Sequence, residues 1–125
     1  MPTDPLLKLR TFCLELPEAT EKLAWGEPTF RVKDKLFAMY ASPTNHHGAG
    51  RPAVWIKATP ANQDLVMRDD PERYFKPPYV GPSGWIGVWL DRRPTWSAVQ
   101  GLLDDGYRLV APKRLLAELD GLPKR

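Results

Sequence analysis

The sequence contains a single cysteine, Cys13, in 125 residues. A lone cysteine excludes an internal disulfide framework and a zinc site built from cysteines alone. No apolar run approaches the roughly 20 residues of a membrane span, and the first residues lack the charged-then-apolar layout of a signal peptide. We therefore expect a cytoplasmic protein with no membrane partner.

Signatures of catalysis are also missing. There is no Gly-x-Ser-x-Gly nucleophile elbow, no phosphate-binding glycine loop and no dinucleotide-binding fingerprint. His46 and His47 are adjacent in a Gly-rich segment without further ligands at metal spacing, which favours a solvated loop over a metal site. Cys13 lies on the apolar stripe of a predicted helix, where a cysteine behaves as a small hydrophobic residue. We expect no metal, no cofactor and no assigned catalytic residue.

The residues that are present fit one globular domain, residues 1–125. Apolar residues make up 42% and charged residues 26%, and a domain of this length buries roughly two-thirds of the surface of its unfolded chain. Eighteen Lys and Arg against 15 Asp and Glu leave a net charge of +3, which permits a nucleic-acid partner without requiring one. The 14 prolines are scattered, which indicates an ordered protein with stiff connections.

Capping residues followed by proline, at Asp4-Pro5 and Thr59-Pro60, predict two helix starts. The first of these helices covers residues 4–16. Two more helices begin after Thr95 and Pro112, and Asp105-Gly106 is predicted to end the former. The predicted strands are residues 29–33, 36–41, 53–58 and 85–91, with one helical turn expected at 72–75. This order indicates an α+β protein, a two-layer sandwich of an antiparallel sheet with helices packed on one face.

Strand alternation predicts that three tryptophans share the other face of this sheet. Side chains of a strand point to opposite faces in turn, so the aliphatic residues face the helices. We call the remaining surface the tryptophan face; its residues are Trp55, Trp85 and Trp89, with Arg31, Lys33 and Lys57 among them. Aromatic rings beside cations can stack on bases and contact phosphate. Alternatively, the rings pack beneath the proline-rich segment 70–84.

A second cationic pair, Lys113 and Arg114, lies in the first turn of the last predicted helix. Cations oppose the helix dipole there, so the pair indicates either an anionic partner at the helix start or solvation beside a nearby carboxylate. Among the carboxylates, Glu21, Glu27 and Asp91 are the candidates for a general base, although a surface ion pair also explains Asp91.

Several short motifs are distributed along the sequence, from the first predicted helix to the last. They are Leu16-Pro17-Glu18 with Glu21, Trp25-Gly26-Glu27-Pro28-Thr29-Phe30-Arg31-Val32, Lys35-Leu36-Phe37-Ala38, Pro78-Tyr79-Val80-Gly81, Gly84-Trp85 and Tyr107-Arg108-Leu109-Val110-Ala111-Pro112-Lys113-Arg114. In combination they resemble the MmcQ/YjbR family of small bacterial proteins. The resemblance implies a CyaY/frataxin-like fold and, because the family is commonly described as DNA-binding, a DNA partner.

Two departures from the family pattern, at residues 44–50 and 84–89, leave room for a ligand particular to this branch. The frataxin comparison does not imply iron binding, because the first helix has only Asp4 and Glu15 as acidic residues.

Three hypotheses follow from the sequence. The first is a small non-catalytic protein that binds DNA, single- or double-stranded, through Arg31, Trp55, Lys57, Trp85, Trp89, Lys113 and Arg114. The second is a protein that binds or sequesters a planar small molecule, in an aromatic pocket between the tryptophan face and the segments 42–52 and 70–84. The third is an enzyme with Glu21 or Asp91 as base.

Overall fold

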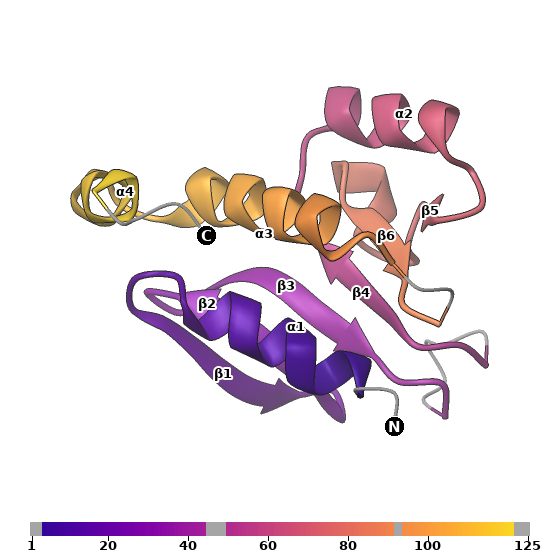
Figure 1. Cartoon of the computed structure of the whole chain (residues 1–125), viewed down its shortest axis with the longest axis horizontal. Coiled ribbons are helices and arrows are strands. Elements are labelled where there is room, and N and C mark those ends of the chain that lie inside the picture. The colour runs from indigo at the N-terminus through magenta and orange to yellow at the C-terminus, as the bar shows by residue number, and fades with distance from the viewer. Residues whose placement is uncertain (1–3, 45–49, 92–93, 122–125) are drawn as a thin grey trace.

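The computed structural model describes residues 4–44, 50–91 and 94–121. Its centre is one antiparallel sheet with the strand order β1-β2-β3-β4-β6-β5 (Figure 1). The strands are β1 (Ala19–Ala24), β2 (Glu27–Val32), β3 (Lys35–Ala41), β4 (Ala53–Ile56), β5 (Tyr74–Phe75) and β6 (Ile86–Trp89). The insert at His46 and His47 lies outside the described residues.

Four of these strands match the predicted ones, and the two strands at the edges of the sheet were not predicted. β1 is mostly exposed and carries the polar run Thr20, Glu21 and Lys22, so it shows no alternating apolar pattern. The helical turn predicted at 72–75 is wrong, because Tyr74 and Phe75 pair with Val88 and Gly87 of β6.

The helices are α1 (Pro5–Leu14), α2 (Pro60–Asp69), α3 (Trp96–Val110) and α4 (Lys113–Asp120), with a short 3-10 helix η1 (Gly81–Ser83). The two predicted caps are confirmed. Asp4 accepts a hydrogen bond from the Leu6 amide at 3.0 Å, and Thr59 accepts one from the Asn62 amide at 3.2 Å. These bonds satisfy amides that the first helical turn leaves unpaired.

The prediction that Asp105-Gly106 ends a helix is wrong, because α3 continues through Gly106 to Val110. A Cβ at Gly106 would lie 2.7 Å from the Lys57 carbonyl oxygen and 3.1 Å from the Ile56 side chain. Gly106 therefore allows α3 to lie close against β4, and its lack of a side chain serves packing rather than termination.

One face of the sheet forms the main core with α1, α3 and α4, and we call it the helix side. In Figure 1, α1 and α3 lie across the sheet and α4 follows beyond the end of α3. Strand residues such as Phe30, Val54 and Ile86 share this core with Leu9, Leu103 and other residues of the helices. The predicted α+β architecture, with helices on one face of an antiparallel sheet, is confirmed. The CyaY/frataxin comparison stays a prediction.

The tryptophan face carries a second, smaller apolar cluster. Its buried residues are Met39, Ala41, Ala53, Trp55 and Trp85. Strand alternation predicted this face for Trp55 and Trp85. The prediction is wrong for Lys33, which lies in the turn after β2 and pairs with Glu18. Among the described helices, none is long and apolar enough to cross a bilayer.

Candidate ligand pocket on the tryptophan face

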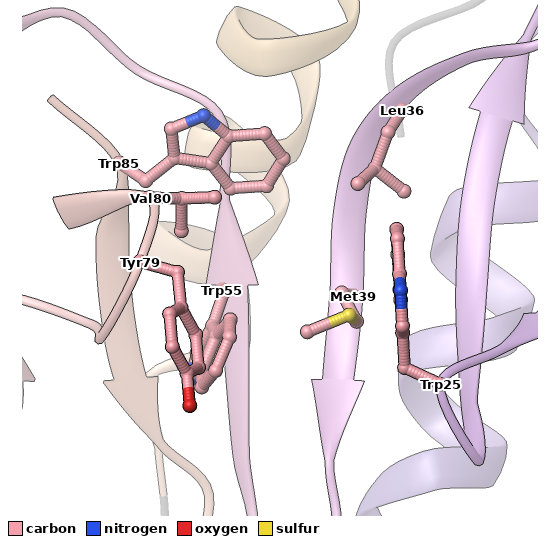
Figure 2. A pocket seen from close by; sticks show the side chains of 7 residues that line it. All are labelled: Trp25, Leu36, Met39, Trp55, Tyr79, Val80 and Trp85. Atoms are coloured by element: carbon pink, nitrogen blue, oxygen red, sulfur yellow. The ribbon is translucent and has the colours of Figure 1, made fainter. Parts of the chain in front are cut away.

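A pocket of about 380 Å³ lies on the tryptophan face (Figure 2). Its lining is apolar and aromatic: Trp25, Leu36, Met39, Trp55, Tyr79, Val80 and Trp85. Met39 of β3 and Trp55 of β4 are paired in register and form the floor. The volume falls in the range of roughly 300–1,000 Å³ that small-molecule sites occupy.

A β-bulge places Leu36 on this face. Arg31 pairs with Leu36 and the next β2 residue in the ladder, Phe30, pairs with Ala38, so Phe37 is the extra residue. As a result Phe37 joins the helix-side core, whereas Leu36 lines the pocket. Bulges commonly redirect a side chain beside a functional site.

Trp25 forms one wall from the turn between β1 and β2. Trp25 and Gly26 have φ values of 54° and 77°, as a two-residue type I′ turn requires. Figure 2 shows the Trp25 ring edge-on beside Met39 and Leu36, facing the gap. Trp25 is 64% exposed as a residue, so it adds little to the buried core.

Tyr79, Val80 and Trp85 form the opposite wall, from the segment between β5 and β6. The Val80 amide donates to the Pro78 carbonyl at 2.7 Å across Tyr79, which has φ 66°. This is a γ-turn of the positive-φ kind, which is rare and strained. Tyr79 is 75% exposed at the mouth of the pocket.

Gln63 of α2 holds this wall in place. Its side-chain amide donates to the carbonyl of Gly81 at 2.8 Å and to the carbonyl of Trp85 at 2.6 Å. Gly84, at φ 100°, packs so closely on α2 that a Cβ would lie 2.5 Å from the Pro60 nitrogen. The second wall and α2 therefore form one unit.

Backbone strain singles out Trp25 and Tyr79. Positive φ is a genuine outlier for a bulky residue, and such strain gathers at functional sites. The described residues include five non-glycine positions with positive φ: Glu18, Trp25, Lys33, Asp34 and Tyr79. The two aromatic ones both line the pocket, on opposite walls.

The structure brings Trp55, Trp85 and Lys57 together at this site. Trp55 is 2% exposed and Trp85 is 6% exposed. The Lys57 Nζ lies 5.8 Å from the centre of the Trp85 ring. Arg31 lies on the same face, beside Leu36 in the β-ladder.

Trp89 lies outside the pocket lining. Its ring stacks on Phe75 with 4.1 Å between centroids, and the Arg51 guanidinium lies 4.1 Å from the Trp89 ring centre. Arg51 also forms a two-pronged ion pair with Asp91, with Nε to Oδ2 at 2.7 Å and Nη2 to Oδ1 at 2.9 Å. The alternative in which the segment 70–84 covers the rings therefore describes Trp89 well.

Lys113 and Arg114 belong to the helix side and do not join the tryptophans. They begin α4, whose Leu115 and Leu119 pack in the helix-side core. Arg114 pairs with Glu18 at 2.9 Å, and Lys33 pairs with the other oxygen of Glu18 at 2.8 Å. The hydrogen bond from Arg114 is the larger cause and that from Lys33 the next, and together they lower the pKa of Glu18 to about 2.

The three candidate bases all have partners. Glu21 receives two hydrogen bonds from Arg10 of α1, at 2.6 and 3.0 Å, and Asp91 binds Arg51 as described. Glu27 is 2% exposed and accepts a hydrogen bond from the Ser42 amide at 2.6 Å. Across residues 4–44, 50–91 and 94–121, no three His, Cys, Asp or Glu side chains gather in a way that could hold a metal ion.

Comparison with known proteins places the chain in a family. The YjbR family model matches residues 14–109, about three-quarters of the sequence. The chain belongs to the YjbR family. The match includes every residue that lines the pocket and ends before α4. A search of the curated proteins found no match.

Two solved structures share this YjbR fold. One is the Deinococcus radiodurans protein DR2400, a DUF419 domain, with a TM-score of 0.72 and 22% identity, covering 98% of this chain and 94% of the other. Another is a Pseudomonas syringae protein with a TM-score of 0.67 and 14% identity, covering 84% of this chain and 97% of the other. At these identities the likeness concerns the fold.

Sequence reasoning missed the two outer aromatic residues of the pocket, Trp25 and Tyr79. Each precedes or follows a recognisable turn residue, in Trp25-Gly26 and in Pro78-Tyr79. A tryptophan before glycine in a hairpin, where asparagine or aspartate is usual, is a signal that could have identified Trp25. Leu36 and Met39 were missed because β3 is apolar on both faces.

Proposed function

We propose that this YjbR protein binds a planar, largely apolar small molecule in the pocket between Trp25 and Tyr79. The observation that carries the proposal is the pocket itself, a cavity of about 380 Å³ with aromatic side chains on both walls and on its floor. Flat rings on facing walls suit a flat apolar ligand, which they can contact face-on or edge-on.

The strained turns support a binding role. Trp25 and Tyr79 are mostly exposed, so neither contributes much buried area, yet each occupies a backbone conformation that is unfavourable for its type. Strain of this kind costs on the order of 1–3 kcal/mol per residue. Contacts with a ligand in the pocket would help to offset this cost.

The nucleic-acid hypothesis has less support from the same face. Stacking on bases needs exposed ring faces, whereas Trp55 and Trp85 are almost fully buried and Trp89 is already stacked on Phe75. The cations proposed for phosphate contact are divided between two faces, since Lys113 and Arg114 lie on the helix side.

A fluorescence titration with N-phenyl-1-naphthylamine, a neutral probe with two flat aromatic ring systems that brightens in apolar surroundings, tests the proposal. We expect saturable binding with little dependence on salt. Leu36→Trp places an indole in the pocket and should raise the Kd of the probe about tenfold or more. A tenfold increase corresponds to a loss of about 1.4 kcal/mol of binding free energy.

Leu65→Trp is the matched control. Leu65 is 65% exposed on α2 and does not line the pocket, so the same substitution there should leave probe binding unchanged. Equal binding by the wild type and both variants would overturn the proposal. Salt-sensitive binding of oligonucleotides that Leu36→Trp leaves intact would favour the nucleic-acid hypothesis instead.

A further inference from the structure

Two cations flank one end of the pocket. Arg31 of β2 pairs with Leu36 in the ladder. Lys57 directly follows β4, and its amide donates to the Phe37 carbonyl at 2.9 Å, so it lies across β3 from Phe37, the neighbour of Leu36. Alternation gives Lys57 the same face as Trp55. Arg31 and Lys57 therefore lie on either side of Leu36, at the end where Figure 2 shows Leu36 and Trp85.

Both cations are half-buried and held in place. The Lys57 Nζ lies above the Trp85 ring, and within the described part of the chain no carboxylate lies within ion-pair distance of it. Arg31 donates from Nε to the hydroxyl of the buried Thr29 at 3.1 Å, and its Nη1 lies 3.9 Å from the exposed Asp34 carboxylate. The Arg31 side chain is only 15% exposed.

Opposite charges lie towards the two ends of β2. Arg31, Thr29 and Glu27 share one face of this strand by alternation. The buried carboxylate of Glu27, which accepts a hydrogen bond from the Ser42 amide, lies at the start of the strand, and Arg31 lies near its end. A ligand with a negative group would be oriented by this gradient, because charges interact more strongly beside an apolar cavity than in water.

We infer that the ligand is an amphipathic anion, a planar apolar body carrying a carboxylate, sulfonate or phosphate that meets Lys57 and Arg31. This inference rests on the proposed function, since it names the ligand class of the same pocket. The aromatic walls hold the body, and the two cations fix which end of the ligand lies beside Leu36. Hydrogen bonds between ionised partners are among the strongest in such sites.

A matched pair of probes isolates the charge. 8-Anilinonaphthalene-1-sulfonate has the same ring skeleton as N-phenyl-1-naphthylamine plus one sulfonate. We expect Lys57→Met to weaken the sulfonate probe about tenfold, in keeping with hydrogen bonds to charged groups, and to change the neutral probe less than about twofold. Arg31→Met should act in the same direction.

Lys8→Met is the matched control, because Lys8 also lies over a tryptophan ring, 5.4 Å from the centre of Trp96, but on α1. It should leave both probes unchanged. Equal weakening of both probes by Lys57→Met, or no weakening of the sulfonate probe, would overturn the anion inference while leaving the pocket intact. Failure of the neutral probe to bind the wild type would overturn the proposed function instead.

Discussion

The two faces of the sheet differ in how completely they are covered. On the helix side, residues such as Phe30, Val54 and Leu103 are fully buried or nearly so, and the helices close the core. On the tryptophan face, a turn and one loop approach each other without meeting, and a cavity is left between them. One strand, β3, therefore contributes to the core through Phe37 and to the cavity through Leu36.

Substitutions at two adjacent residues of β3, Phe37 and Leu36, should give the largest difference between the two faces. Phe37 is fully buried, and its ring packs edge-on against Tyr107 with 5.7 Å between centroids. Phe37→Ala should lower the free energy of unfolding by about 3–5 kcal/mol. Leu36→Ala, one residue away on the pocket side, should cost about 1 kcal/mol while weakening the neutral probe. Urea unfolding measures both; similar losses would erase the distinction between the faces.

The contact between α3 and the sheet offers a second test on the helix side. Gly106→Ala places a Cβ against the Lys57 carbonyl and should destabilise by about 1–3 kcal/mol. Gly101→Ala, on the same helix with nothing within 4 Å of the new Cβ, should stabilise by about 0.4–1 kcal/mol. Denaturant midpoints of the two variants should therefore move in opposite directions; a shared direction would contradict the close-approach explanation.

A substitution at Trp25 tests whether this residue contributes to ligand binding rather than to stability. Asparagine suits the first position of a type I′ turn, so Trp25→Asn relieves strain on the order of 1 kcal/mol. We expect unchanged or higher thermal stability together with about tenfold weaker binding of the neutral probe. Trp25→Phe, which keeps a flat ring, should retain most of the binding. Lower stability with intact binding would assign Trp25 to the structure rather than to the ligand.

The smallest effect concerns Glu18, which joins α4 to the turn between β2 and β3. Its pKa falls from an ordinary 4.5 to about 2 because Arg114 and Lys33 hydrogen-bond the ionised form. A lowered folded-state pKa contributes stability that is fully present above the unfolded value and lost as the pH falls through the folded one. Between about pH 5 and pH 2, melting temperature should fall less for Glu18→Gln than for the wild type.

Glu72→Gln is the control for that measurement, since Glu72 is exposed on the turn before β5. It should follow the wild-type curve over the same range. A Glu18→Gln curve that also matches the wild type would show that the two hydrogen bonds do not stabilise the fold.

The central strands and the helix starts were predictable because their signals are local. Alternation in β2, β4 and β6 assigns each residue to a face. Asp4 and Thr59 are capping residues followed by proline, a local pattern that marks where a helix begins. β1 escaped prediction because an exposed edge strand does not need apolar residues at every second position. Gly106 was misinterpreted because a glycine that ends a helix and one that permits close packing look alike in sequence.

The pocket was predictable only in outline. Its tryptophan floor follows from alternation, and one wall comes from the segment 70–84 as expected, whereas none of the described residues of the segment 42–52 lines the pocket. The other wall comes from Trp25, which the turn between β1 and β2 places there, and Leu36 faces the pocket because of the bulge at Phe37. The turn has a local signal in Trp25-Gly26, whereas the bulge has none because β3 is apolar on both faces.

The two hydrogen bonds from Gln63 make the second wall of the pocket dependent on α2. α2 has no fully buried residue, although its Val66 touches the helix-side core. Gln63 and Gly84 join α2 to the loop that carries Tyr79, Val80 and Trp85. The position of the second wall therefore depends on a helix that supplies none of the residues lining the pocket.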